Sequence, residues 1–297
     1  MAKNQHYLPR FLLKGFASRK KKQNAYAWVY SQAGEVFEAN TFRICAEKFF
    51  YGEEGAGSLD DEITEFEHTY AQLLDELRAK TGITKIEDKS IAEFITHLIT
   101  RSRHIRDSVR EPAEYFLEKL KEQFIEKLSP LPYPIKHQLT EKFIKLCTEA
   151  IQKSPEMTKH GQLKALSEDL IPEKRTRKYK ELNWYSCETK ENLLLGDVGC
   201  VIETIGKKRF ISIDMRSDIL RNIYLPISSN HVIVGTNQDT EPSADVGLLN
   251  SETVKLSRTI FIASQNNPEF NELLPLIGKN SGLITKEKLE EIVAKKL

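Results

Sequence analysis

The feature that most constrains the fold is a switch in the period of the apolar residues along the chain. Residues 25–30 and 35–38 alternate as the two strands of a hairpin do, whereas residues 59–80 repeat apolar side chains at three- and four-residue steps. From residue 182 the period returns to two. This β, α, β order predicts an α+β fold, with a mixed or antiparallel sheet built from N- and C-terminal strands and an all-helical middle inserted between them.

The same order predicts the domain organisation. We expect residues 1–58, an N-terminal β part, and residues 181–297, a C-terminal α+β part, to form one domain. Residues 59–180 are then an inserted helical subdomain.

Prolines are expected to divide the helical insertion. Pro112 is predicted to begin a helix that reaches about Leu128, and further helices are expected at residues 135–153 and 157–170. Residues 172–180 read as a basic linker.

Composition and charge narrow the classes of partner. The 297 residues include 44 basic and 43 acidic side chains, so the net charge of +1 gives no general attraction to nucleic acid or anionic lipid. Four cysteines lie far apart, without C-x-x-C spacing, which favours free thiols in a reducing cytosol. No apolar run approaches about 20 residues and the N-terminus lacks a signal-peptide core, so we expect a cytoplasmic protein without a membrane partner.

Four polar residues stand where apolar ones are expected. Glu67 and Arg101 fall on the apolar rows of two successive helices, where an unpaired charge is costly to bury. They either form a buried ion pair or line a pocket in which Arg101 binds phosphate and Glu67 acts as a base or metal ligand. Asp197 interrupts a strand-like apolar run and either caps backbone amides or joins such a site. His6 is either a core histidine, a general acid/base or a metal ligand.

The opening motif carries a family resemblance. His6-Tyr7-Leu8-Pro9, followed by Leu13 and Phe16, resembles the start of the domain-of-unknown-function 4238 (DUF4238) family. The resemblance extends patchily over most of the chain, through Phe66-Glu67, the arginine-rich Arg101 to Arg106, Asp197 and Asn250. It selects the same residues that the cost of burial singles out, and it implies no established activity.

Two functions of different classes follow. In the first, His6, Glu67, Arg101 and Asp197 converge as the catalytic residues of a metal-dependent nuclease or related phosphate-directed enzyme, such as a toxin-like or antiphage effector. A divalent metal would be its cofactor and nucleic acid or a phosphate-containing ligand its partner. The expected substrate contacts are Tyr7, Arg10, Arg103, Arg106, Arg175 and Lys178. In the second, the protein is a non-catalytic binding or regulatory protein in which the four residues form a buried structural network.

Overall fold

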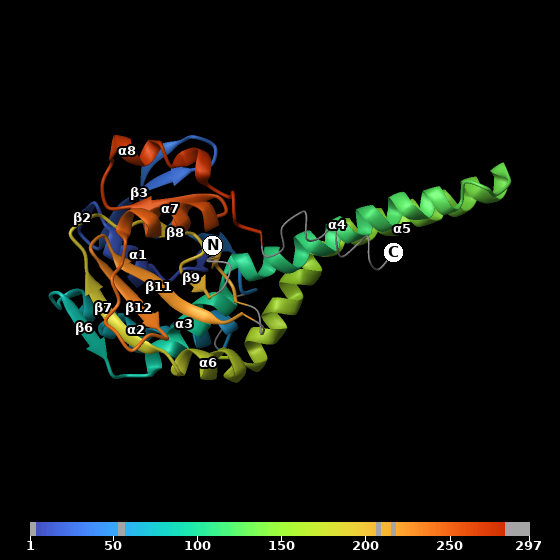
Figure 1. Ribbon diagram of the computed structural model, residues 1–297. Coiled ribbons are helices and arrows are strands. Elements are labelled where there is room, and N and C mark those ends of the chain that lie inside the picture. Colours follow the sequence, from blue (N-terminus) through green and yellow to red (C-terminus); the bar gives the residue numbers. More distant parts are fainter. Residues whose placement is uncertain (1–3, 53–56, 206–208, 215–217, 283–297) are drawn as a thin grey trace. The chain divides into compact units, whose positions relative to one another are not determined.

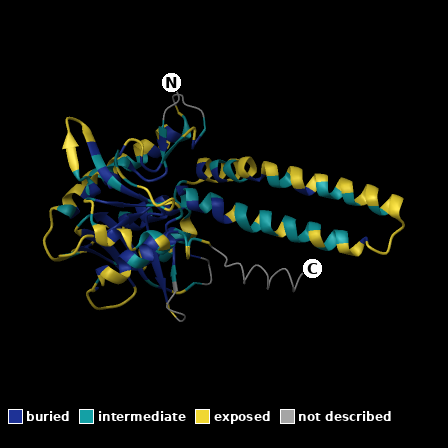
Figure 2. Ribbon diagram, turned by 90° about the horizontal axis from the view of Figure 1, so that it is seen from above, coloured by how far each residue is buried: buried dark blue, intermediate teal, exposed yellow. Residues whose placement is uncertain are grey.

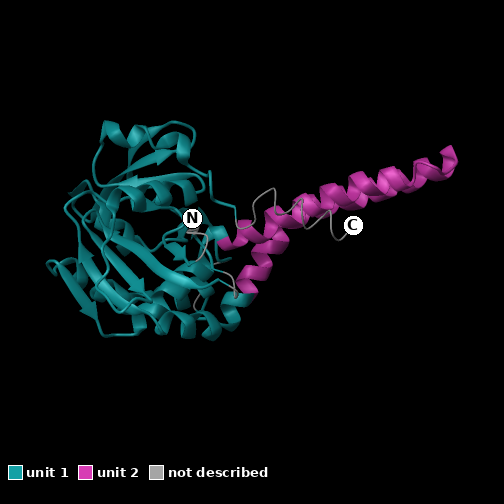
Figure 3. Cartoon of the chain, in the orientation of Figure 1, with its two compact units in different colours: residues 1–104, 165–282 teal, residues 105–164, 283–297 magenta. Residues whose placement is uncertain are grey.

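The computed structural model describes residues 4–52, 57–205, 209–214 and 218–282, and within them the chain has the predicted α+β fold (Figure 1). Contacts divide the chain into two compact units, coloured separately in Figure 3. The first comprises residues 1–104 and 165–282, and the described part of the second is residues 105–164. Residues 59–104 and 165–180 are thus grouped with the strands. The inserted helical subdomain at residues 59–180 stays a prediction.

A six-stranded antiparallel sheet forms much of the first unit. Its strands lie in the order β10-β9-β11-β12-β7-β6. Their bounds are Arg209–Ile211, Val201–Thr204, Leu220–Ser228, His231–Thr236, Asn183–Glu188 and Ile83–Ile86. The two inner strands β11 and β12 are buried along nearly their whole length, which agrees with their apolar runs at residues 223–227 and 232–234.

A second sheet joins the two ends of the chain. It has the order β2-β3-β13-β8, and β4 also pairs with β3. The bounds are β2 Arg19–Lys21, β3 Asn24–Ser31, β13 Ile260–Ala263, β8 Leu195–Gly196 and β4 Val36–Asn40. Ile260 of β13 lies opposite Ser31 of β3, so N- and C-terminal strands share a sheet as predicted. Tyr30 stacks on Phe261 there, with ring centroids 4.6 Å apart, and both side chains are fully buried.

A short antiparallel ribbon fixes the N-terminal segment. It pairs β1 (Asn4–His6) with β5 (Ala46–Lys48). The chain then passes through α1 (Arg10–Leu13) and the 3₁₀ turn η1 (Lys14–Phe16), where Leu12, Leu13 and Phe16 are fully buried.

The helices of the first unit follow the sequence pattern closely at α2 and α3. Helix α2 (Leu59–Arg78) is capped by Ser58, whose hydroxyl accepts the Asp61 N–H. Its apolar face meets α3 (Ser90–Arg101) through the stacked rings of Tyr70 and Phe94. The remaining elements are α6 Glu173–Lys180, α7 Val246–Leu256, α8 Pro268–Asn271 and η2 Leu274–Leu276.

Two long helices account for the described part of the second unit. They are α4 (Arg103–Lys127) and α5 (Tyr133–Glu168), and Figure 2 shows exposed and half-buried residues along most of their length. Phe124 of α4 stacks on Phe143 of α5 with ring centroids 3.9 Å apart, and Ser154 donates to Glu114. Among the described residues, no helix combines the length and apolarity needed to cross a membrane.

Three local expectations differ from the structure. Pro112 lies inside α4 and Pro155 inside α5, where the sequence predicted helix boundaries. Each proline removes one intrahelical hydrogen bond, a loss that the long helix on either side outweighs. The expected basic linker is the helix α6, because Glu173 in its first turn and the cations of its last turn complement the helix dipole.

Candidate functional site

Arg101, the last residue of α3, is bound entirely by protein groups. Its side chain is 1% exposed, and its Nη1 forms an ion pair with Glu67 of α2. Nη2 donates to the main-chain oxygen of His6 at 2.6 Å, and Nε donates to that of Tyr7 at 3.3 Å. All three nitrogens of the guanidinium group therefore hold parts of the chain together.

Glu67 depends on Arg101 more than on its other basic neighbour. The Nε2 atom of His97 lies 3.7 Å from the Glu67 carboxylate, and Nδ1 lies 3.3 Å from the Leu170 oxygen. Because a carbonyl oxygen can only accept, Nδ1 carries the proton. Burial lowers the pKa of His97, so the imidazole is neutral and its Nε2 does not donate to Glu67.

His6 reaches this pair through its main chain. The Nε2 atom of its ring donates to the Thr41 oxygen at 3.1 Å. Burial, and then the charge of nearby Arg101, lowers the pKa of the imidazole. The structure thus brings His6, Glu67 and Arg101 together, with the His6 carbonyl as the link.

Asp197 is satisfied elsewhere. It follows β8, is 6% exposed, and accepts the N–H groups of Arg258 and Thr259 at 2.8 Å each, with Ile260 at 3.2 Å. The Thr259 hydroxyl donates to it as well, at 2.8 Å. Burial raises the pKa of Asp197 while these donors oppose the shift. In the described part of the chain, it makes no hydrogen bond or ion pair with His6, Glu67 or Arg101.

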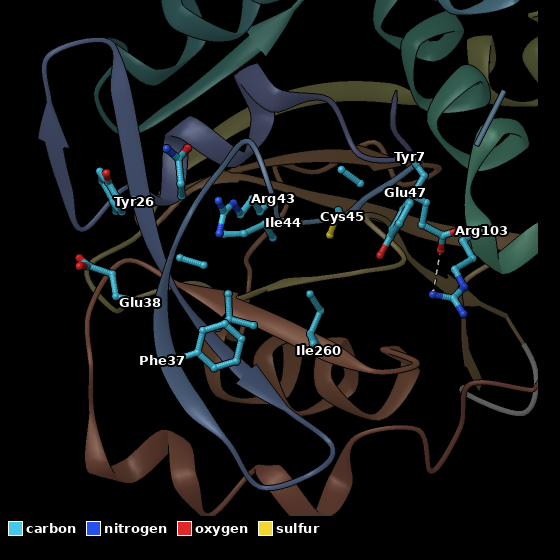
Figure 4. A pocket seen from close by; sticks show the side chains of 14 residues that line it. Tyr7, Tyr26, Phe37, Glu38, Arg43, Ile44, Cys45, Glu47, Arg103 and Ile260 are labelled. Carbon is cyan, nitrogen blue, oxygen red and sulfur yellow. Dashed lines mark ion pairs between the residues drawn. The ribbon is translucent and has the colours of Figure 1, made fainter. Parts of the chain in front are cut away.

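A cavity of about 670 Å³ opens beside the N-terminal segment, and we call it the Tyr7 cavity. Figure 4 shows Tyr7, Cys45 and the Glu47–Arg103 ion pair, 3.0 Å long, at one end, with Tyr26 and Glu38 towards the other. Apolar side chains complete the wall, including Val29, Phe37, Ile44 and Ile260.

Tyr7 and Cys45, which line this cavity, carry a hydroxyl and a thiol that stay protonated. Burial, reinforced by the nearby Asp197 carboxylate, raises the pKa of both the Tyr7 hydroxyl and the Cys45 thiol. A protonated thiol is a poor nucleophile, so the cavity is better suited to holding a ligand than to attacking one. Mixed apolar and polar walls of this size are typical of small-molecule sites.

The other predicted contact residues lie in several places. Arg103 lines the Tyr7 cavity, and Arg10 lines a neighbouring one. In the second unit, Arg106 donates to Gln162 at 2.9 Å. Arg175 and Lys178 of α6 both pair with Asp214, at 3.3 and 2.9 Å, so one carboxylate balances much of their charge. Among the described residues, no three His, Cys, Asp or Glu side chains are grouped so that they could hold a metal ion.

Sequence reasoning missed the segment that builds the cavity wall. Residues 40–47 have no helical or strand period, yet they supply Arg43, Cys45 and Glu47. The available signal was Asn40, a residue that favours turns because its side chain caps nearby amides. Its Oδ1 accepts the Phe42 N–H at 3.0 Å, and its carbonyl accepts the Arg43 N–H at 2.8 Å.

Comparison with known proteins identifies the family. The chain matches the family described as "Protein of unknown function (DUF4238)" over residues 4–266, which include every one of the site residues above. No curated protein and no solved structure matches the chain. The chain therefore belongs to the DUF4238 family, and the resemblance of its opening motif is confirmed.

Proposed function

We propose that this member of the DUF4238 family is a non-catalytic binding protein, in which Glu67, Arg101 and Asp197 stabilise the fold and the Tyr7 cavity accepts a ligand. One observation carries the proposal: every nitrogen of the Arg101 guanidinium group donates to a protein acceptor. A phosphate would have to displace the Glu67 carboxylate or a main-chain oxygen, leaving a buried polar group without its partner.

The two remaining members of the expected site support the same function. The Asp197 carboxylate is engaged by four donors, so a metal ion would have to replace them. The imidazole of His6 is held at the Thr41 oxygen, whereas the hydrogen bond to Arg101 is made by the His6 main-chain oxygen. Neither group is arranged for proton transfer to a shared substrate.

The cysteines support a reducing compartment for this binding protein. All four, Cys45, Cys147, Cys187 and Cys200, are buried free thiols. We therefore place the proposed function in the cytoplasm, where thiols remain reduced.

The test compares stability with cleavage. Arg101→Ala leaves Glu67 and two carbonyl oxygens without their donor, so we expect the free energy of unfolding to fall by about 3–5 kcal/mol. Arg101→Lys keeps the charge but cannot reach all three acceptors, and its loss should be smaller. The matched control is Arg177→Ala, which removes an exposed pair with Glu173 and should leave unfolding by denaturant nearly unchanged.

A metal-dependent nuclease, of the toxin-like or antiphage kind, is the competing outcome. The wild-type chain is incubated with RNA and DNA in Mg²⁺, Mn²⁺ or Zn²⁺, and we expect no cleavage. Cleavage that is lost in a Glu67→Gln variant with a normal melting curve would overturn the proposal. So would an Arg101→Ala variant that unfolds at the wild-type denaturant concentration.

A further inference from the structure

A second cavity in the first unit is lined almost wholly by basic and amide side chains. Its volume is about 650 Å³, and we call it the basic cavity. It adjoins the Tyr7 cavity, with which it shares Asn40 and Arg43. Its lining, as far as the described residues go, consists of three cations, three carboxamides and one aromatic ring and includes no carboxylate: Arg10, Lys14, Arg43, Gln23, Asn24, Asn40 and Phe42.

The three cations of this cavity differ in their pairing from other arginines of the first unit. Other arginines of the first unit, such as Arg19 and Arg78, are paired with a carboxylate. Within the described residues, Arg10, Lys14 and Arg43 form no ion pair. The Nε atom of Arg10 is buried and finds no hydrogen-bond partner in the part of the chain that the structure describes, an arrangement that is costly unless a further acceptor binds.

Local structure holds these cations close to one another. Arg10 begins α1, and the Lys14 N–H donates to the Arg10 oxygen, so the two side chains leave the same side of one helical turn. Like charges at this spacing repel. Arg43 enters from the turn that Asn40 closes, and the Asn40 amide donates to Asn24 at 3.1 Å, which ties that turn to β3. Two separate segments thus direct positive charge into one cavity.

An exposed aromatic ring lies next to the cations. Phe42 is 43% exposed, and the Arg10 guanidinium carbon is 5.5 Å from the centre of its ring. The His6 ring meets Phe42 edge-on with centroids 6.0 Å apart, which steadies it from one side. Proteins that bind single-stranded nucleic acid often stack a base on an exposed aromatic ring while nearby cations bind the phosphates of the strand.

We propose that the basic cavity binds a nucleotide, either free or as part of a single strand, with its phosphate on Arg10, Lys14 and Arg43 and its base on Phe42. Guanidinium groups suit phosphate because they donate two parallel hydrogen bonds to its oxygens. This inference goes beyond the proposed function, which places a ligand in the Tyr7 cavity, by assigning a class of ligand to the adjoining basic cavity. No bond of the ligand is made or broken.

The experiment measures binding to the full-length chain by fluorescence anisotropy. One probe is a labelled nucleoside diphosphate and the other a labelled short single-stranded oligonucleotide, so that the stronger binder identifies the source of the nucleotide. Lys14→Ala with Arg43→Ala, both exposed residues, should weaken binding by about tenfold or more. The double variant should also reduce the slope of log affinity against log salt by roughly one to two.

The matched control removes two exposed cations outside the basic cavity, by the substitutions Lys174→Ala and Lys190→Ala. It changes the net charge equally and should bind as the wild type does. An equal loss of affinity in both double variants would overturn the assignment, because it would reflect net charge alone. Failure of the folded wild type to bind either probe would overturn it as well.

A third variant tests the base. Phe42→Leu should weaken nucleotide binding by roughly fivefold or more while leaving competition by pyrophosphate unchanged. If Phe42→Leu weakened the binding of nucleotide and pyrophosphate equally, Phe42 would not stack on the base. If neither probe binds, this inference fails while the proposed function stands, since the Arg101 variants and the cleavage assay decide that. If the oligonucleotide is cut, the proposed function itself fails.

Discussion

His104 shows how burial alone can make the stability of this protein depend on pH. It is 2% exposed, and its Nε2 lies 2.6 Å from the Ser212 hydroxyl. Burial, followed by the charge of Arg258, lowers the pKa of the imidazole to about 3. In the unfolded chain the same group has a pKa of about 6.5 and takes up a proton below that pH.

The stability contribution of a neutral His104 is therefore complete above about pH 6.5 and is lost as the pH falls towards 3. We expect a loss of up to about 1.4 kcal/mol of unfolding free energy per pH unit in that range. His104→Asn should reduce the difference between melting curves recorded at pH 7.5 and pH 5.5. The exposed His160→Asn is the control and should keep the wild-type difference; an unchanged slope in His104→Asn would contradict the prediction.

At the scale of residues, the sequence identified which side chains were costly to bury and offered a partner for Glu67, but it did not identify the donors to Asp197. Glu67 and Arg101 were found because they interrupt apolar helical rows, and they do form an ion pair. Asp197 was found in the same way. Its donors at residues 258–260 lie about sixty positions later, where no periodicity points to them. Arg43 lies in a turn, and a turn has no buried face to mark it.

At the scale of elements, the 3₁₀ turn η1 packs so closely against β11 that no side chain fits at Gly15. A Cβ there would lie 2.0 Å from the Ile227 oxygen. Arg78 closes the same contact, because its Nε donates to that oxygen at 2.9 Å and its Nη2 to the Phe11 oxygen at 3.0 Å. A second arginine thus fastens this segment by its main chain, as Arg101 does.

Gly15→Ala should force β11 and the segment apart and lower the free energy of unfolding by about 1–3 kcal/mol. The matched control is Gly161→Ala in α5, where no atom of the described residues lies within 4 Å of the added Cβ. That change should raise helix stability by up to about 1 kcal/mol. Denaturant unfolding of both variants checks the opposite signs. A neutral Gly15→Ala would mean that the close approach to Ile227 does not persist in solution.

Elements were predictable where the apolar period was long. Helices α2 and α3 and the β3–β4 hairpin have the expected positions to within a few residues. Strands such as β1, β5 and β6 are only three or four residues long, too short to show a period, and they exist because a partner strand pairs with them. The predicted helix boundaries at Pro112 and Pro155 were wrong, because tertiary contacts and the length of each helix outweigh the local effect of one proline.

For the whole molecule, the order of strand, helix and strand was enough to predict that the ends meet. It could not show that the strands form two main sheets, since pairing partners depend on contacts between distant residues. Nor could it show that α2, α3 and α6 group with the strands, while residues 105–164 form a unit of their own.

Hydrogen exchange should reveal this division. Most side chains of residues 115–150 are exposed or half-buried, whereas β11 and β12 are buried nearly throughout. Amides of residues 115–150 should therefore exchange at least about tenfold faster than those of the two strands, as measured by mass spectrometry. Residues 91–99 of α3 are the control, since they are helical but mostly buried and should be protected like the strands. Equal protection throughout would refute the expectation.

The pairing of β3 with β13 also bears on synthesis. Ser31 leaves the ribosome early, yet its partner Ile260 is more than two hundred residues behind it. Until then, the part of the β3 edge that β13 covers stays open to other extended chains. The nascent protein thus passes through most of its translation with an unfinished sheet, a state in which chaperones matter most.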